Sequence, residues 1–326
     1  MSWIGVDLGG TKIYGVVVKG AEVVHEAKRK TPTQGGPLAV VDAIAALVTD
    51  DLGGLDGVHG VGIGAPGVVD VVTGTVHEAP NLAGWVEPFD LGPAVAEAFG
   101  GHPVTVDNDV NVGTVAEHRI GAGKGANELL GVFVGTGVGG GLILDGRLRR
   151  GSTGLAGEIG HVAVEQRGRL CGCGGRGHLE AYAGRAGLER RARELDGEGR
   201  DTMLVELAPA KRMTSSVFAK ALAAGDPVAI ELLDEAVEAL GVAISSAVTL
   251  LDLRLVVVGG GLADRLGPAF VGRVEQAARS RSFTSNSPLR VVPGELGDRS
   301  GAVGAALVAA EGIGPRRPGE EPSNRR

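Results

Sequence analysis

Two separate stretches of the chain share one arrangement, which is a strand, a glycine-rich turn and a second strand. The first covers residues 4–18, with its turn at 9–12, and the second covers residues 129–146, with its turn at 135–141. Apolar, β-branched runs on both sides of a glycine cluster are typical of β-hairpins. Because a glycine tip lets a ligand come close to backbone N–H groups, the repeat predicts two related halves, each with a binding turn.

Strand and helix patterns alternate around these hairpins. Residues 58–64 and 255–258 have the composition of buried strands, and residues 40–47 have the spacing of an amphipathic helix. The sequence Asp-Asn-Asp at 107–109 follows a short strand pattern and contains residue types that favour the start of a helix. Alternation of this kind favours an α/β fold.

The length of 326 residues, together with the repeat, suggests two domains. We predict a smaller N-terminal α/β domain at 1–108, joined by a C-terminal helix at about 298–312. A larger α/β domain is expected at 109–297 and includes an irregular, glycine-rich loop at 157–180. Residues 314–326 are rich in proline and charge, which predicts a disordered tail.

Composition argues against several classes of function. The chain has 32 basic and 39 acidic side chains and a net charge of −7, unlike strongly basic nucleic-acid-binding proteins. Residues 1–7 lack the features of a secretion signal. The longest apolar stretch, 239–251, is shorter than the ~20 residues that span a bilayer and predicts a buried helix. Cys171 and Cys173 are the only cysteines, and a bridge between thiols one residue apart would be strained, so we expect a reducing, cytoplasmic setting. From the charge balance and the short apolar stretch we expect no nucleic-acid or membrane partner.

The first glycine turn, Gly9-Gly10-Thr11-Lys12, directly follows Asp7-Leu8. Glycines at such a turn allow backbone N–H groups to approach a phosphate, and the preceding carboxylate suits a metal-bound nucleotide. Taken alone, the motif is equally compatible with a plain hairpin whose aspartate is satisfied by local amides. The P-loop pattern is absent from this segment.

The second glycine turn, residues 135–140, matches the G-x-G-x-x-G pattern of dinucleotide sites. A dinucleotide turn opens a helix, whereas here the apolar residues 141–144 lead into an Asp-Gly turn, which indicates a strand. We therefore interpret it as a hairpin phosphate loop. Two such hairpins can face one another across a cleft and hold a triphosphate, with the glycines at 259–261 receiving the adenosine.

Both cysteines lie in a short segment that also contains two histidines. His161, Cys171, Cys173 and His178 together supply two thiolates and two imidazoles, which is a complete tetrahedral shell for Zn²⁺. Four protein ligands leave no open position for a catalytic water, so such a site would be structural. The alternative is a loop with two reduced cysteines and two solvated histidines.

The same segment carries the most specific resemblance to a known family. The chain resembles the ROK sugar kinases, of the sugar kinase and actin-like superfamily, from residue 4 to about 310. The family pattern is E-x-G-H, nine residues, then C-x-C-G-x-x-G-C-x-E. Residues 158–161 and 171–180 match it at every fixed position except one, because His178 stands where the third cysteine belongs.

The resemblance implies a two-domain, actin-like (ribonuclease H-like) α/β fold with a central cleft. It implies that Asp109 is the general base, although an aspartate there also suits a helix cap. It assigns contacts with sugar hydroxyls to Asn81, Asn108, Asp109, Glu158, His161 and Glu180. The residues expected to bind ATP with Mg²⁺ are Asp7, Gly9, Gly10, Thr11, Lys12, Gly135, Thr136, Gly137, Gly260 and Gly261.

The implied activity is ATP-dependent phosphorylation of a hexose, with glucose to glucose 6-phosphate as the first expectation. An amino-sugar kinase acting on kanosamine, N-acetylglucosamine or N-acetylmannosamine is the alternative, and a non-catalytic sugar sensor is a weaker one. Repressors of the family carry a DNA-binding segment before the kinase-like part, and because the first hairpin starts at Ile4 we expect no such segment here. The resemblance also implies a homodimer or homotetramer.

Overall fold

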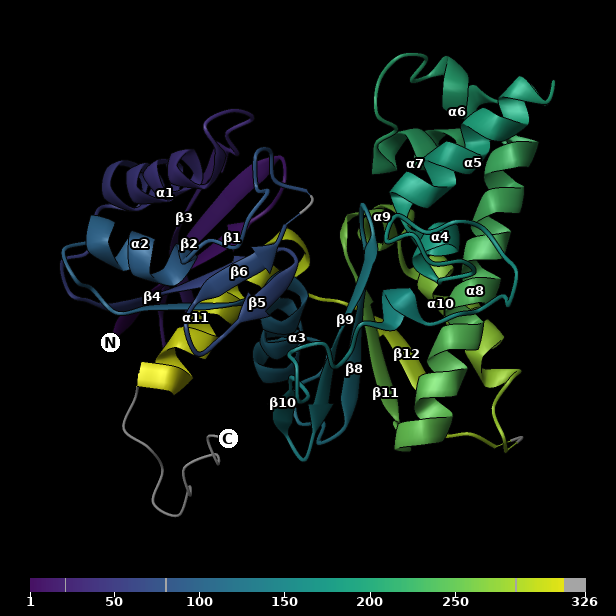
Figure 1. The fold of residues 1–326 in the computed structure, drawn as a ribbon. Coiled ribbons are helices and arrows are strands. Elements are labelled where there is room, and N and C mark those ends of the chain that lie inside the picture. Colours follow the sequence, from purple (N-terminus) through teal and green to yellow (C-terminus); the bar gives the residue numbers. More distant parts are fainter. Residues whose placement is uncertain (21, 80, 285, 314–326) are drawn as a thin grey trace. The chain divides into compact units, whose positions relative to one another are not determined.

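The computed structural model describes residues 1–20, 22–79, 81–284 and 286–313 and forms two compact units (Figure 1). Unit 1 consists of Met1–Asp109 together with the chain from Gly301 onward, and unit 2 consists of Val110–Ser300. The predicted tail at 314–326 lies outside the described residues. Among the described residues no helix is long and apolar enough to cross a membrane.

Unit 1 is built on a five-stranded sheet in the order β3-β2-β1-β4-β7. The first three strands are antiparallel, and β4 and β7 extend the sheet parallel to β1. The strands are β1 (Ser2–Leu8), β2 (Lys12–Lys19), β3 (Glu22–Lys30), β4 (Val58–Ala65) and β7 (Val104–Asn108). A separate two-stranded sheet contains β5 (Val68–Asp70) and β6 (Thr75–Glu78).

Helices cover both faces of this sheet. Alternate residues of β1, such as Ile4 and Val6, are buried in a core shared with α1 (Gly36–Ala46) and α2 (Leu91–Ala98). The opposite face receives α11 (Ser300–Ile313), visible in yellow against the sheet in Figure 1. A Cβ atom at Gly5 would lie 1.8 Å from the Ala302 carbonyl oxygen of α11. Glycine is therefore needed there for the helix backbone to reach the strand.

Unit 2 repeats the sheet order of unit 1, as the two hairpins predicted. Its five strands run β10-β9-β8-β11-β12, with β8 to β10 antiparallel and β11 and β12 parallel to β8. The strands are β8 (Leu129–Val134), β9 (Val138–Leu144), β10 (Arg147–Arg149), β11 (Leu255–Gly259) and β12 (Arg290–Pro293). The Asp-Gly turn after β9 is present, with Asp145 in the left-handed region at φ 55°.

The helix α3 (Asp109–Ile120) packs on one face of the unit 2 sheet, where Thr114 contacts the glycines at 131 and 141. Buried side chains on the other face pack with the long helix α8 (Pro227–Leu251) and with α10 (Pro268–Arg279). The remaining helices are α4 (Glu180–Ala183), α5 (Arg185–Gly197), α6 (Met203–Glu206), α7 (Ser215–Ala223) and α9 (Gly261–Leu266).

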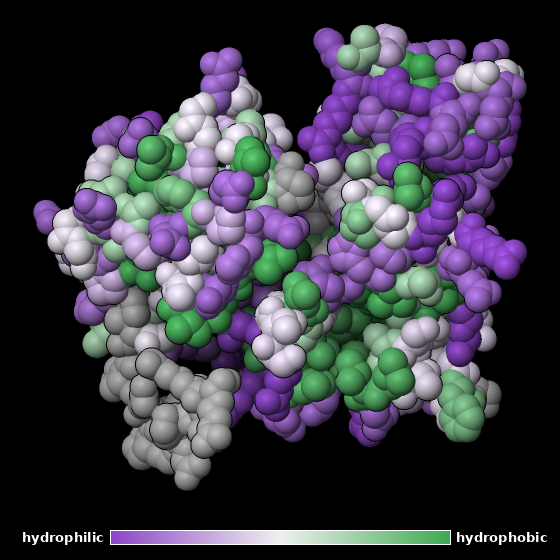
Figure 2. Space-filling view, in the orientation of Figure 1, coloured by the Kyte–Doolittle hydropathy of each residue, from purple (hydrophilic) through white to green (hydrophobic). Residues whose placement is uncertain are grey.

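The expectation of a buried helix at 239–251 needs a correction. These residues form the second half of α8, and Leu240 and Ile244 are buried, but Leu250 is 82% exposed. Leu250 lies on the solvent-facing side of the helix, beside Ser246 and Thr249, which are also exposed. Hydrophilic residues dominate the visible surface over α5 to α7 (Figure 2).

Candidate functional site

The predicted residues of unit 1 lie at one edge of its sheet, where the parallel strands β1, β4 and β7 end. The registers pair Asp7 with Gly64 and Ala65 with Asn108, so the ends of the three strands are level. Asp109 follows as the first residue of α3. Ligands of α/β sheets bind outside the carboxyl ends of parallel strands, which makes this edge a candidate binding surface.

The hairpin tip at this edge is held by backbone contacts. Gly9 donates its N–H to the Lys12 carbonyl at 3.0 Å, and Thr31 donates its N–H to the Thr11 carbonyl at 3.2 Å. A Cβ atom at Gly10 would lie 2.6 Å from the backbone oxygen of Asn81. The structure therefore brings Asn81, a predicted sugar contact, next to the predicted nucleotide turn.

Asp7 lies at the N-terminus of a helix of unit 1, and Asn108 contacts a glycine with positive φ. A Cβ atom at Gly301 would lie 2.7 Å from the carboxyl carbon of Asp7, which places this carboxylate at the N-terminus of α11. The positive end of a helix dipole stabilises a carboxylate in that position. Asn108 donates its amide to the carbonyl of Gly67 at 3.1 Å, and Gly67 has φ 90°.

The predicted residues of unit 2 also gather at the carboxyl ends of strands. Gly259 of β11 pairs with Phe133 of β8, so the glycines that follow these strands are neighbours. Gly260 has φ 91°, and a Cβ atom there would lie 2.7 Å from the backbone nitrogen of Val134. Gly135 donates its N–H to the Gly137 carbonyl at 2.9 Å, which closes the second hairpin tip.

Glu180 connects this hairpin tip with the cysteine-bearing loop. One carboxylate oxygen accepts the N–H of Val138 at 3.1 Å, and the other accepts the thiol of Cys171 at 3.5 Å. A Cβ atom at Gly137 would lie 2.1 Å from the carboxylate, so glycine is required for this approach. Sequence reasoning assigned Glu180 to sugar binding; the structure adds that it supports the second glycine turn.

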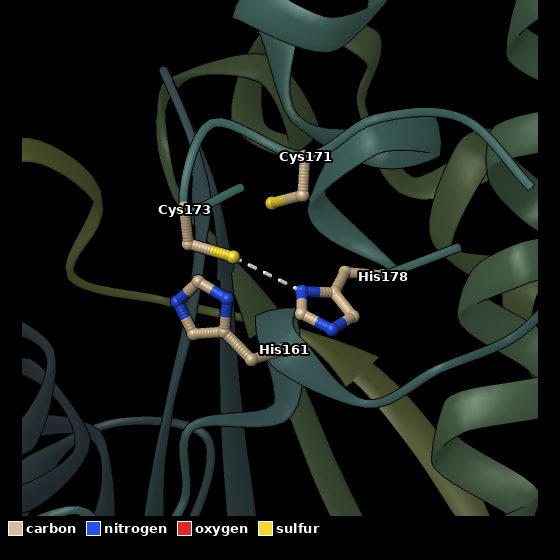
Figure 3. A group of neighbouring side chains, drawn as sticks. All are labelled: His161, Cys171, Cys173 and His178. Atoms are coloured by element: carbon tan, nitrogen blue, oxygen red, sulfur yellow. Dashed lines mark hydrogen bonds between the residues drawn. The ribbon is translucent and has the colours of Figure 1, made fainter. Parts of the chain in front are cut away.

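The four predicted metal ligands come together in unit 2 (Figure 3). One potential ligand atom each from His161, Cys171, Cys173 and His178 lies within 4.8 Å of the other three. The Cys173 sulfur is 3.2 Å from Nδ1 of His178, and the two imidazole rings lie 5.5 Å apart at an angle of 81°. Cys171 is buried, whereas Cys173 and His161 are exposed.

Glycines shape the loop that carries these ligands. Cys171 donates its N–H to the Gly175 carbonyl at 2.8 Å, and Gly174 donates to the Cys171 carbonyl at 3.0 Å, so residues 171–175 form a tight double turn. A Cβ atom at Gly175 would lie 2.3 Å from the His178 ring. A Cβ atom at Gly160 would lie 1.9 Å from the Val138 carbonyl, so the short helix at 159–161 packs directly on β9.

Burial perturbs two ionisable groups of this loop. It raises the pKa of the Cys171 thiol to about 11; a hydrogen bond from the Cys173 backbone opposes this shift, while the Cys173 thiol and the charge of Glu180 add to it. Burial is also the main cause that raises the pKa of Glu158, and the charge of Glu180 adds to it while His161 opposes it. Without a cation the buried thiol therefore stays protonated, and a metal ion would have to displace its proton.

Sequence reasoning missed three residues that the fold places near these edges. Arg185 and Arg212 both donate to the Thr136 hydroxyl, and Glu117 of α3 accepts N–H groups from residues 295 and 296. These partners are separated by 49 to 179 residues along the chain. No local spacing signals such pairs.

The repeated sheet order, with a glycine hairpin at the matching edge of each half, defines an actin-like sugar kinase fold. The chain belongs to the ROK family, whose model matches residues 3–311. A glucokinase from Streptomyces coelicolor is 36% identical to this chain over 315 residues, which are 94% of this chain and 97% of the relative.

Two further relatives indicate the range of the family. The crystal structure of a ROK family glucokinase from Streptomyces griseus, in complex with glucose and AMPPNP, has a TM-score of 0.80 and 34% identity and covers 94% of this chain and 99% of its own. An N-acetylmannosamine kinase from Vibrio cholerae is 30% identical over 295 residues, which are 90% of this chain and 95% of the relative.

Proposed function

We propose that this chain is an ATP-dependent hexose kinase that converts glucose to glucose 6-phosphate. The observation that carries the proposal is the presence of two matching glycine-tipped sheet edges, one of which also presents Asp7, Asn108 and Asp109. The glucokinases from Streptomyces coelicolor and Streptomyces griseus, which match nearly the whole chain, support this choice of activity.

Asp109 would be the general base. In phosphoryl transfer to an alcohol, the substrate hydroxyl attacks the γ-phosphorus while a carboxylate accepts the hydroxyl proton and ADP leaves. Asp109 directly follows β7, and the side chain of neighbouring Asn108 is bonded to Gly67. These contacts define the backbone position of Asp109. Mg²⁺ would neutralise the phosphates, with Asp7 close to it or joined through water.

Sugar recognition would rest on Asn81, Asn108, Glu158, His161 and Glu180, in addition to Asp109. Each sugar hydroxyl both donates and accepts a hydrogen bond, and amide, carboxylate and imidazole groups can satisfy both functions. The nucleotide would be bound by Asp7, Gly9, Gly10, Thr11 and Lys12 of unit 1 and by Gly135, Thr136, Gly137, Gly260 and Gly261 of unit 2.

We also propose a structural Zn²⁺ held by His161, Cys171, Cys173 and His178. The two thiols and two imidazoles suit this ion, and their ligand atoms lie within 4.8 Å of one another. Ligand atoms around a tetrahedral zinc lie about 3.5 Å apart, so modest side-chain shifts would complete the shell. His161 has two ring nitrogens, and one can bind the metal while the other faces the sugar.

A coupled assay over a panel of hexoses and amino-hexoses tests the activity. We expect ATP consumption and a phosphorylated product, with the highest kcat/KM on glucose. The 30% identity to an N-acetylmannosamine kinase favours an amino-sugar kinase as the second candidate, and preference for an amino-hexose would establish it instead. A chain that binds sugar but consumes no ATP with any member of the panel would be a sensor, and the kinase proposal would be wrong.

Two further expectations belong to this proposal. The compact units would correspond to the two predicted domains, with boundaries near Asp109 and Ser300. The chain would form a homodimer or homotetramer, which light scattering on the purified protein measures directly.

A further inference from the structure

Two guanidinium groups of unit 2 converge on one hydroxyl group. Arg185 donates to the Thr136 side-chain oxygen at 2.6 Å, and Arg212 donates to the same oxygen at 3.1 Å. Thr136 is the middle residue of the second glycine tip, between Gly135 and Gly137. Positive charge is therefore concentrated at the point where this tip presents its backbone.

The two arginines differ from other arginines of the same unit. Arg200 and Arg169, for example, each pair with a carboxylate, at 2.7 and 2.6 Å. No carboxylate of the described residues lies within 4.0 Å of a guanidinium nitrogen of Arg185 or Arg212. Glu189, whose charge acts on Arg185, is bound to Arg193 at 2.9 Å. Two like charges are thus held side by side, and neither forms an ion pair with a carboxylate of the described residues.

The backbone fixes Arg185 in this place. The first amides of α5 donate to the hairpin tip, from Arg185 to the Gly135 carbonyl at 3.1 Å and from Ala186 to the Thr136 carbonyl at 3.0 Å. The Arg185 side chain also donates to the Met213 carbonyl at 3.2 Å. The first turn of α5 contains no acidic residue, so its helix dipole adds positive potential.

The segment that carries Arg212 is positioned as well. Arg193 donates to the carbonyls of Ala208, Pro209 and Lys211, and Met213 donates its N–H to Glu189 at 2.9 Å. These bonds surround Arg212 in sequence and hold its backbone, while its side chain is exposed. Arg212 can therefore contact a ligand in solvent without a rearrangement of the chain.

The pKa of the Arg185 guanidinium reflects the electrostatic cost of holding the two arginines together. Burial lowers the pKa of this half-buried group, and the charge of Arg212 lowers it further. The negative charge of an anion bound between the two groups would offset both effects. Guanidinium groups match phosphate in particular, because their planar N–H groups can donate to two oxygens at once.

We propose that Arg185, Arg212 and the Thr136 tip form a binding site for the linear phosphate chain of the phosphoryl donor. This inference rests on the proposed function, and it adds two specificity-determining residues outside the glycine turns. ATP and inorganic polyphosphate share the chemistry that this site recognises. The site would bind phosphates that stay with the leaving group and would make no contact with the sugar.

The direct test is calorimetric titration of the full chain with MgATP and, separately, with sodium tripolyphosphate. Arg212→Ala is the first variant because its side chain is exposed, and Arg200→Ala is the matched control because Arg200 pairs with Glu231 at the surface. We expect Arg212→Ala to raise the Kd for MgATP by about 10- to 100-fold, as for loss of a charged hydrogen bond. The control should bind like the wild type, and unchanged binding by Arg212→Ala would overturn the proposal.

Arg185→Lys provides a second variant that keeps charge and most of the packing. It should weaken MgATP binding and raise the KM for ATP by about 10-fold, while the KM for the sugar stays within about 2-fold. A rise in the KM for sugar with an unchanged KM for ATP would contradict a phosphate site. Thermal unfolding of each variant identifies any that fails to fold.

The two probes separate the donor sources. If the arginine variants weaken ATP and tripolyphosphate equally, the site recognises the phosphate chain itself, and inorganic polyphosphate is a candidate donor. If they weaken only ATP, the site serves the nucleotide alone. Because binding is measured without turnover, arginine-dependent ATP binding in a chain that phosphorylates no sugar would reject the proposed function and keep this inference. Normal turnover with arginine-independent binding would reject only the inference.

Discussion

Replacing Glu117 tests the account of how unit 2 holds its sheet edge. The Glu117 side chain is 2% exposed, and its carboxylate accepts three backbone N–H groups. The donors are Ala122 at 3.0 Å, Glu295 at 3.1 Å and Leu296 at 2.9 Å. The contact ties the C-terminal part of α3 to the segment that follows β12, close to Gly294 and Gly259.

The size of the effect follows from these bonds. A hydrogen bond to a charged acceptor contributes about 1.5–3 kcal/mol. Glu117→Gln replaces one oxygen by an NH₂ group, which sets a donor against at least one N–H, so we expect a loss of about 2–4 kcal/mol in the free energy of unfolding. For a unit of about 190 residues this corresponds to a fall in Tm of about 5–15 °C.

Urea unfolding and differential scanning calorimetry measure both quantities. The matched control is Glu206→Gln, because Glu206 is exposed on α6 and should change stability by less than about 0.5 kcal/mol. If Glu117→Gln is as stable as this control, the three amides are satisfied without the carboxylate, and our reading of this contact is wrong.

Three other predictions concern the metal, the first sheet edge and pH. Elemental analysis should find about one Zn²⁺ per chain, released by Cys171→Ser but retained by His77→Gln; a metal-free, fully active wild type would reject the zinc site. Gly301→Ala should displace the Asp7 carboxylate and raise the KM for MgATP by about 10-fold. The control Gly272→Ala adds a Cβ atom that meets no atom within 4 Å and should leave this KM unchanged. An equal KM for MgATP in the two variants would refute a role of Asp7 in binding MgATP. The protein around Asp264 partly desolvates its carboxyl group, and with the charges of Asp298 and Glu117 this raises the pKa of Asp264 to about 6. The folded chain therefore holds this proton more tightly than the unfolded chain, and stability falls as pH rises from about 4 to about 6. Asp264→Asn should remove that fall and raise the free energy of unfolding at pH 8 by about 1 kcal/mol or less, because the side chain remains in contact with solvent. An unchanged dependence of stability on pH in this variant would contradict the prediction.

Features set by neighbouring residues could be predicted from the sequence. The two hairpins follow from glycines between apolar runs, although the sequence predicts the second tip at 135–141 and it covers only 135–137, because β9 already begins at Val138. The α3 start at Asp109 follows from the residue types at 107–109. The cysteine and histidine cluster could be found because its four members occupy a single short segment, 161–178. In each case the information lies within about one element of the chain.

Features that depend on tertiary packing could not be predicted. Arg212 lies 76 residues from Thr136, and Glu117 lies 178 residues from Glu295, so only the folded sheet brings them together. Arginine and glutamate are also common at surfaces, and their residue type gives no sign of a special contact. The exposed Leu250 has the same origin, because hydrophobicity alone does not reveal which side of a helix faces solvent in the folded chain.

The most direct test of the kinase proposal compares wild type and Asp109→Asn in a coupled ATP and glucose assay, with glucose binding measured alongside. The control is Asp56→Asn, an exposed position in unit 1. We predict that wild type forms glucose 6-phosphate and that Asp109→Asn lowers kcat by about 10²-fold or more while glucose binding changes only a few-fold. Turnover by Asp109→Asn at a rate close to that of Asp56→Asn would contradict the assignment of Asp109 as the base.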